Sequence, residues 1–144
     1  MSDLTMSKAT REAFLADVHV GVLCASRPGA APLASPVWYL YEPGGDVRVV
    51  VGRTSQKAEL VAAAGVASFC VQSEALPYRF VTVEGPVVIE EGAADIAFAM
   101  AARYLGDELA KGYVASTADH DSVIVRITPT RWRTNDYSNW TPEG

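Results

Sequence analysis

The chain has 144 residues, of which 49% are hydrophobic and 20% are charged, and its formal net charge is −5. This composition excludes a disordered chain and predicts one globular domain over residues 1–144, while the acidic balance argues against nucleic acid or an anionic membrane as a partner. No stretch approaches the ~18 apolar residues of a membrane span, and no signal-peptide core precedes the domain, so we expect a cytoplasmic protein.

The first elements expected in chain order are a short helix and two strands. Residues 7–17 have a helical pattern, with Ala13, Phe14 and Val18 able to face a core, and residues 19–26 form an apolar run typical of a strand. After a turn rich in Pro and Gly, a second strand follows. Links this short predict that consecutive strands are antiparallel neighbours.

The second strand, over residues 33–42, contains Ser35, Pro36, Val37, Trp38 and Tyr39 and is apolar on both faces. Proline cannot donate to a strand ladder, so Pro36 belongs at a sheet edge or an interruption. Two interpretations stay open. One face may be buried in a core and the other in a dimer contact, or the aromatic rings may form a platform for a flat heterocycle.

Residues 46–64 combine a strand, a glycine turn and a helix. Valines at every second position up to Val51 give the period-2 pattern of a half-buried strand. Gly52 permits the turn, and Thr54 or Ser55 can cap the helix through its hydroxyl.

This turn carries two cations where a helix usually attracts anionic side chains. Lys57 falls in the first helical turn, and Arg53 precedes it with no acidic residue following before Glu59. Two cations, the hydroxyls of Thr54 and Ser55 and free backbone N–H groups together suit a phosphate. The alternative is an ordinary capped surface helix whose cations fall there by chance.

The second half of the chain alternates strands with one helical insertion. Strands are expected over residues 65–73, 78–91 and 121–128, and a helical segment, broken near Gly106, over residues 93–115. Gly85 and Pro86 mark a bend in the long strand, of the kind that barrels use to curl. The segment from residue 129 reads as an aromatic tail. Together these elements predict a mainly β (α+β) fold, a small six-stranded antiparallel barrel with short helices.

Several other residues are weaker candidates for a site. Tyr78 and Arg79 could bring a guanidinium to a bound anion, although Arg79 could equally be a surface residue. Trp140 either packs against another surface or walls a pocket. The run around His120 is interpreted as a solvated loop. The two histidines and two cysteines have no metal-ligand or nucleophile spacing, so neither a metal site nor a catalytic residue is predicted.

Read in order, residues 20–42, 49–61 and 78–89 resemble the pyridoxamine 5′-phosphate oxidase-like split-barrel superfamily, specifically its short actinobacterial deazaflavin-dependent branch. The resemblance covers roughly residues 10–134 and implies a homodimer with two cofactor sites in the groove between subunits. It implies that the turn after the third strand holds the cofactor phosphate, that the second strand lies along the ring, and that residues 78–79 and the tail reach the site, including from the partner. The cofactor-binding residues so implied are Ser35, Pro36, Val37, Trp38, Tyr39, Arg53, Thr54, Ser55, Lys57, Tyr78, Arg79 and Trp140.

The function implied by the resemblance is a flavin- or deazaflavin-dependent oxidoreductase. The expected cofactor is coenzyme F420, which would transfer a hydride to a small electron-poor acceptor. An FMN-binding oxidase or reductase and a non-catalytic F420 carrier are the alternatives. The chain ends DYSNWTPEG, without the Arg-rich substrate motif of pyridoxamine phosphate oxidases proper, so vitamin B6 oxidation is not expected. The proton donor stays open between solvent and Tyr39.

Overall fold

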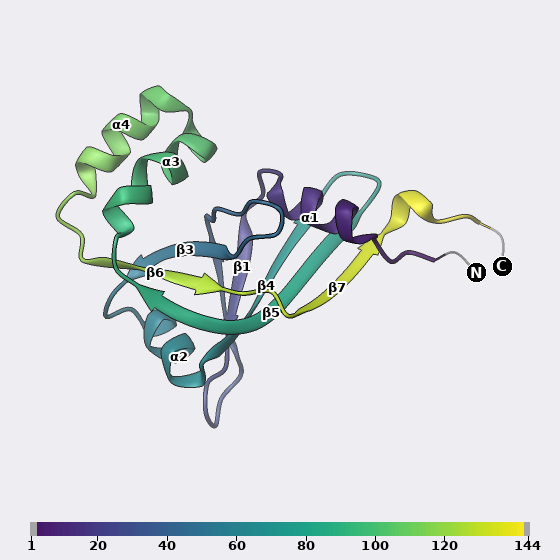
Figure 1. Ribbon diagram of the computed structural model, residues 1–144, viewed down its shortest axis with the longest axis horizontal. Coiled ribbons are helices and arrows are strands. Elements are labelled where there is room, and N and C mark those ends of the chain that lie inside the picture. The colour runs from purple at the N-terminus through teal and green to yellow at the C-terminus, as the bar shows by residue number, and fades with distance from the viewer. Residues whose placement is uncertain (1–2, 143–144) are drawn as a thin grey trace.

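The computed structural model describes residues 3–142, which form a curled antiparallel sheet flanked by helices (Figure 1). The strands are β1 (Gly21–Ala25), β2 (Leu33–Val37), β3 (Val47–Gly52), β4 (Val66–Ser73), β5 (Arg79–Glu90), β6 (Ser122–Ile127) and β7 (Arg131–Asp136). The helices are α1 (Lys8–Ala16), α2 (Gln56–Ala64), α3 (Ala93–Leu105), α4 (Asp107–Ser116) and the short 3-10 helix η1 (Tyr137–Asn139). The predicted split-barrel fold class is confirmed. None of these helices is long and apolar enough to cross a membrane.

The barrel is split because the two end strands of the sheet, β2 and β3, do not pair with each other. The strand order is β2-β1-β4-β5-β6-β3, with β7 pairing with β5. Among the described residues, no pairing joins β2 to β3; the chain beyond β2 meets β3 at a bridge between Leu40 and Arg48, whose backbones exchange hydrogen bonds of 2.9 and 3.0 Å. Antiparallel pairing of consecutive strands is therefore right for β1 and β2. It is wrong for β2 and β3, because β3 takes β6 as its partner.

The bend predicted at Gly85 is the point where β5 changes partners. On one edge, residues 79–84 pair with β7, and residues 87–90 pair with β6. The chain passing from β6 to β7 crosses directly over Gly85, where an added Cβ would lie 1.8 Å from the carbonyl oxygen of Thr128. Only glycine allows this close approach.

Strand β7 corrects the interpretation of the C-terminal segment as a tail. Its sequence, RWRTND, holds a single apolar residue, Trp132, so no period-2 hydrophobic pattern marks it as a strand. It pairs along one edge of β5 in a register that places Trp132 opposite Val83.

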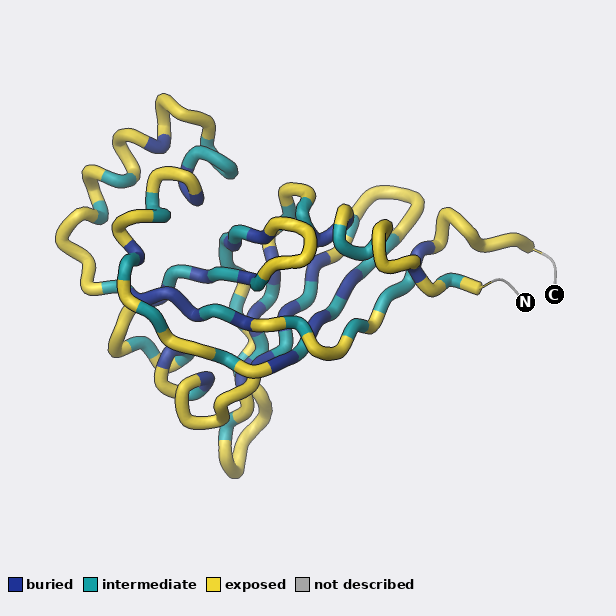
Figure 2. Tube along the Cα trace, viewed as in Figure 1, coloured by how far each residue is buried: buried dark blue, intermediate teal, exposed yellow. Residues whose placement is uncertain are grey.

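The core fills the inside of the curl, and buried residues alternate along the central strands (Figure 2). Helix α1 contributes Phe14 and Leu15 to this core. Ala13 and Val18, which were also expected to face the core, do not. Ala13 lies on the exposed face of α1, and Val18 follows the end of this helix and is 57% exposed.

Candidate functional site

Lys57 spans the split between the two end strands. Ser55 is the N-cap of α2, accepting a hydrogen bond from the backbone of Ala58 at 3.2 Å, and this cap fixes the first helical turn. From that turn, the Lys57 Nζ donates to the Ser35 Oγ on β2 at 3.3 Å. Lys57 has no ion-pair partner among residues 3–142. An unpaired cation therefore sits beside the edge strand, where the sequence predicts an anion.

Arg53, unlike Lys57, is paired with acidic side chains. Its Nη1 and Nη2 donate to the two carboxylate oxygens of Glu91, both at 2.7 Å, and its Nε donates to Asp121 at 3.0 and 3.1 Å. These hydrogen bonds lower the pKa of the Glu91 carboxyl and raise the pKa of the Arg53 guanidinium. The absence of a nearby acid, inferred from the sequence around Arg53, is thus wrong in three dimensions. We call Arg53, Glu91 and Asp121 the clasp.

The two hydroxyls of the turn differ in availability. The Ser55 hydroxyl donates to the carbonyl of Gly52 at 2.7 Å while it caps α2, so its proton is already used. The Thr54 side chain is exposed and has no hydrogen-bond partner in the described part of the chain. Thr54, rather than Ser55, has a hydroxyl ready for a ligand.

The strand predicted as a ring platform divides its side chains between two environments. Val37 and Trp38 line a cavity, whereas Tyr39 is fully buried and donates its hydroxyl to the carbonyls of Leu15 and Asp17 at 2.6 and 3.1 Å. Burial raises the pKa of Tyr39 well above its usual range. The prediction that Tyr39 could donate the proton is wrong, because the ring lies in the core. Pro36 is exposed on the same strand.

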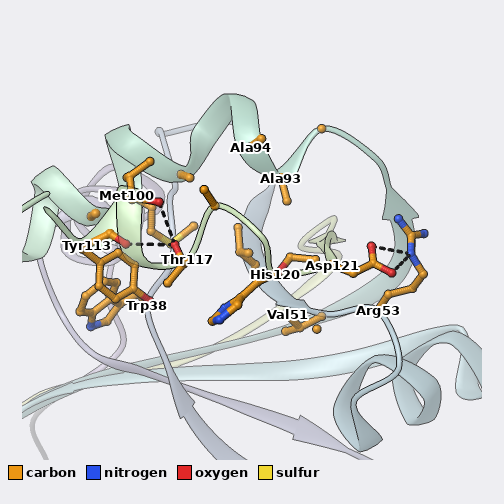
Figure 3. Close-up of a pocket in the computed structure, with 18 of the residues that line it drawn as sticks. Trp38, Val51, Arg53, Ala93, Ala94, Met100, Tyr113, Thr117, His120 and Asp121 are labelled. Carbon is orange, nitrogen blue, oxygen red and sulfur yellow. Dashed lines mark hydrogen bonds and ion pairs between the residues drawn. The ribbon is translucent and has the colours of Figure 1, made fainter. Parts of the chain in front are cut away.

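A cavity of about 660 Å³ lies between the α3–α4 hairpin and the strands β3 and β6 (Figure 3). Trp38, Met100 and Tyr113 lie toward one end, and the clasp residues Arg53 and Asp121 toward the other. This size and mixture of apolar walls with a few polar groups are typical of small-molecule sites.

The α3–α4 hairpin is held over this cavity by aromatic packing. Trp38 stacks on Tyr104 of α3, with ring centroids 4.9 Å apart and planes 6° from parallel, and it contacts Tyr113 of α4 at 5.3 Å. The Tyr104 hydroxyl in turn accepts from the backbone N–H of Tyr39 at 3.1 Å and donates to the carbonyl of His19 at 2.7 Å. Trp38 thus acts as a wall of the cavity and a support of its roof.

The loop around His120 is exposed, as predicted, but sequence reasoning did not place it beside the cavity. The imidazole of His120 projects into the middle of the cavity (Figure 3), and its neighbour Asp121 belongs to the clasp. Knowledge of the strand register would have shown that Asp121 lies beside Arg53. Pairing of β3 with β6 sets Gly52 opposite Ser122, which places the next residue, Arg53, beside Asp121.

Three predicted site residues lie at the opposite end of the molecule. Tyr78 accepts a backbone hydrogen bond from Tyr137 of η1 at 2.9 Å, Arg79 packs its guanidinium over the ring of Phe14 at 4.9 Å, and Trp140 follows η1. The length of β5 separates Arg79 from the clasp, roughly 35 Å along the strand at about 3.3 Å per residue (Figure 1). Within one chain these residues therefore lie far from the clasp.

Comparison with known proteins places this geometry in a family. The family model described as pyridoxamine 5′-phosphate oxidase matches residues 7–136. The chain belongs to the pyridoxamine 5′-phosphate oxidase family. This membership covers both the Lys57 turn and the hairpin that roofs the cavity, so the candidate site lies wholly inside the family domain.

Solved structures similar to this family member share its fold. A conserved hypothetical protein from Mycobacterium tuberculosis is 24% identical with a TM-score of 0.80, covering 100% of this chain and 96% of its own. An F420 reductase is 23% identical with a TM-score of 0.68, covering 85% and 94%. An FAD-binding protein from Mesorhizobium loti is 17% identical with a TM-score of 0.64, covering 93% and 96%. No curated protein matches the sequence.

Proposed function

We propose that this protein is an oxidoreductase that binds coenzyme F420 at the split between β2 and β3 and reduces a small electron-poor acceptor. The observation that carries the proposal is the unpaired Lys57, which reaches across the split to Ser35, two residues before Val37 in the wall of a cavity of about 660 Å³. Membership of the pyridoxamine 5′-phosphate oxidase family, and fold neighbours named for F420 and FAD, support a flavin-type cofactor.

The residues at the split fit the phosphate of such a cofactor. Lys57 supplies a cation, Thr54 a free hydroxyl, and the first turn of α2 supplies backbone N–H groups at the positive end of the helix dipole. Val37, on the same face of β2 as Ser35, continues from this seat into the cavity. A phosphate at Lys57 and a flat ring toward Trp38 can therefore belong to one ligand.

The bound deazaflavin supplies the hydride, and the chain supplies orientation and electrostatics. The hairpin α3–α4 covers one side of the cavity and confines an acceptor near the ring, where reacting atoms need to approach to about 3–3.5 Å. The proton that completes the reduction comes from solvent or from His120, whose imidazole projects into the cavity (Figure 3).

We also propose that the site is completed by a second copy of the chain in a homodimer. The distance along β5 from Arg79 to the clasp supports this, since a partner could bring its own Tyr78, Arg79 and Trp140 to the split. Leu76 and Trp140, 78% and 58% exposed, give that end of the molecule apolar surface for such a contact.

The test is to identify the cofactor and then the reaction. The absorbance of the purified protein and the mass of the ligand released on denaturation distinguish F420 from FMN. Reduced F420 is then offered with a panel of enones and quinones, and oxidation of the cofactor is followed by its absorbance. We expect acceptor-dependent turnover. A protein that binds F420 tightly but reduces no acceptor would instead be a carrier, and one that releases FMN would be a flavin oxidase or reductase.

A further inference from the structure

A side chain from α3 is inserted where the ladder between β1 and β2 stops. The last pair of that ladder is Gly21 with Val37, and the same register continued by two residues sets His19 opposite Tyr39. There the backbone N–H of Tyr39 donates to the Tyr104 hydroxyl at 3.1 Å, and this hydroxyl donates to the carbonyl of His19 at 2.7 Å. The Tyr104 hydroxyl thus bridges the two chain segments at the point where direct backbone pairing has ended.

The ring of Tyr104 also holds the indole of Trp38. Trp38 follows the last residue of β2, so no strand ladder fixes its backbone, and its side chain is half-buried. The two rings stack with centroids 4.9 Å apart and planes 6° from parallel. Trp38 lines the cavity and Tyr104 does not, so Tyr104 lies behind the indole wall (Figure 3). One side chain therefore fixes both the indole and the backbone that follows it.

Tyr104 is in turn held from the end of α1. The preceding residue, Arg103, donates from its two terminal nitrogens to the carbonyls of Ala16 at 3.1 Å and Asp17 at 2.7 Å. These carbonyls lie at the C-terminal end of α1, where a cation is favoured by the helix dipole. The Arg103 guanidinium also lies over the Tyr104 ring, 5.6 Å from its centroid. The support behind Trp38 is therefore part of the fold and needs no ligand to form.

We propose that Tyr104 is a positioning residue, which acts through Trp38 by holding the indole as a fixed wall against which an acceptor is aligned with the cofactor. The effect on the reaction rests on the proposed function, whereas the placement of Trp38 can be tested without a ligand. Misplacement of a reacting group by about 1 Å can cost on the order of 100-fold in rate. Lys57 has its own contact on α2 and β2, so loss of Tyr104 should lower turnover and leave cofactor affinity nearly unchanged.

The first test observes Trp38 directly in the full chain labelled with 5-fluorotryptophan. The three tryptophans give three fluorine NMR signals, and the signal of Trp38 is identified by its loss in Trp38→Phe. Tyr104→Leu removes both the ring and the hydroxyl, and we expect the Trp38 signal to shift and broaden while those of Trp132 and Trp140 stay in place. Tyr104→Phe keeps the stacked ring and loses only the hydroxyl bridge, so its change should be smaller and in the same direction.

The second test measures turnover of reduced F420 with the acceptor panel and, separately, the dissociation constant of F420. In Tyr104→Leu, kcat should fall about tenfold and the dissociation constant should stay within about twofold of the wild type. Tyr104→Phe should restore most of kcat. The control is Gly85→Ala, which destabilises the fold at a position outside the cavity wall. It should keep both kcat and the Trp38 signal, so a loss specific to Tyr104→Leu is not a consequence of lowered stability.

The outcomes separate this proposal from the proposed function. An unmoved Trp38 signal in Tyr104→Leu, or a moved signal with kcat equal to that of the wild type, would overturn the positioning role. If Tyr104→Leu does not fold, Tyr104→Phe decides in its place, and wild-type values of both the Trp38 signal and kcat would overturn the role. A wild type without turnover would overturn the proposed function and the kinetic consequence with it, while the fluorine signal still decides whether Tyr104 holds Trp38.

Discussion

At the scale of single residues, Lys57 and Arg53, the two cations of the turn after β3, differ in their partners. Lys57 faces the split with only a serine hydroxyl as partner, whereas Arg53 is held by Glu91 and Asp121. Four positions apart in sequence, they differ because β3 pairs with β6 and thereby brings acids to Arg53 alone.

Replacement of Lys57 by alanine should weaken cofactor binding by on the order of 1.5–3 kcal/mol, the range for hydrogen bonds to charged groups. The measurement is a fluorescence titration with F420. Lys8→Ala, an exposed lysine on α1, is the control and should leave affinity unchanged. Equal affinity of wild type and Lys57→Ala would place the anion elsewhere.

His19 should make stability depend on pH. Its Nε2 lies 3.0 Å from the carbonyl oxygen of Phe14 and its ring packs on Phe14, and burial lowers the pKa of the imidazole below 6.5 in the folded state. The unfolded chain then takes up the proton more readily. The contribution of His19 to stability is therefore present above pH 6.5 and lost as the pH falls toward the lowered pKa.

Urea unfolding of the wild type and His19→Gln between pH 7.5 and 5.5 measures this effect. The slope due to one proton is at most about 1.4 kcal/mol per pH unit, and smaller here because the ring is partly exposed and screened by water. The variant should show a flatter profile in this window. Identical profiles would remove His19 as the cause.

At the scale of elements, one tyrosine hydroxyl helps to tie the α3–α4 hairpin to the rest of the fold. Tyr104→Phe should cost about 1–3 kcal/mol, because the N–H of Tyr39 and the carbonyl of His19 both lose their partner. Tyr113→Phe is the matched control, since its hydroxyl has no hydrogen bond in the described region. Hydrogen exchange in α3 should accelerate in the first variant only. Equal protection in both would mean that contacts other than this hydroxyl hold the hairpin.

The strand β5 should tolerate no side chain at its crossing point. Gly85→Ala places a Cβ against the backbone of Thr128 and should destabilise by about 3 kcal/mol, lowering the melting temperature by roughly 10 °C. Gly112→Ala in α4, where an added Cβ meets nothing within 4 Å, should instead be neutral or stabilising. An unchanged melting temperature for Gly85→Ala would mean that the backbone at Thr128 can move away from residue 85 without loss of stability.

Local signals predicted the elements well and the contacts between them poorly. The cap at Ser55, the bend at Gly85 and the break at Gly106 follow from residue chemistry within a few positions. The clasp joins residues 38 and 68 positions apart, which no local pattern reports. Strand β7 was missed because its stability comes from pairing with β5 rather than from its own apolar residues.

At the scale of the whole molecule, we expect a homodimer. Static light scattering at micromolar concentration should give twice the mass of one chain, and a monomer would count against a site shared by two copies. A sharper test mixes Lys57→Ala with Arg79→Ala and allows subunits to exchange. If each site takes Lys57 from one copy and Arg79 from the other, about a quarter of the sites should regain full affinity. No recovery would mean that each chain binds the cofactor with its own residues.

The opening between β2 and β3 could in principle be closed by a foreign strand, since unpaired sheet edges are templates for aggregation. Pro36 lies within β2 and has no backbone N–H to donate to an added strand. Lys57 of helix α2 also lies against this edge, where it donates to Ser35 of β2. The same stretch of backbone that discourages the addition of a foreign strand is therefore the one along which the proposed cofactor would bind.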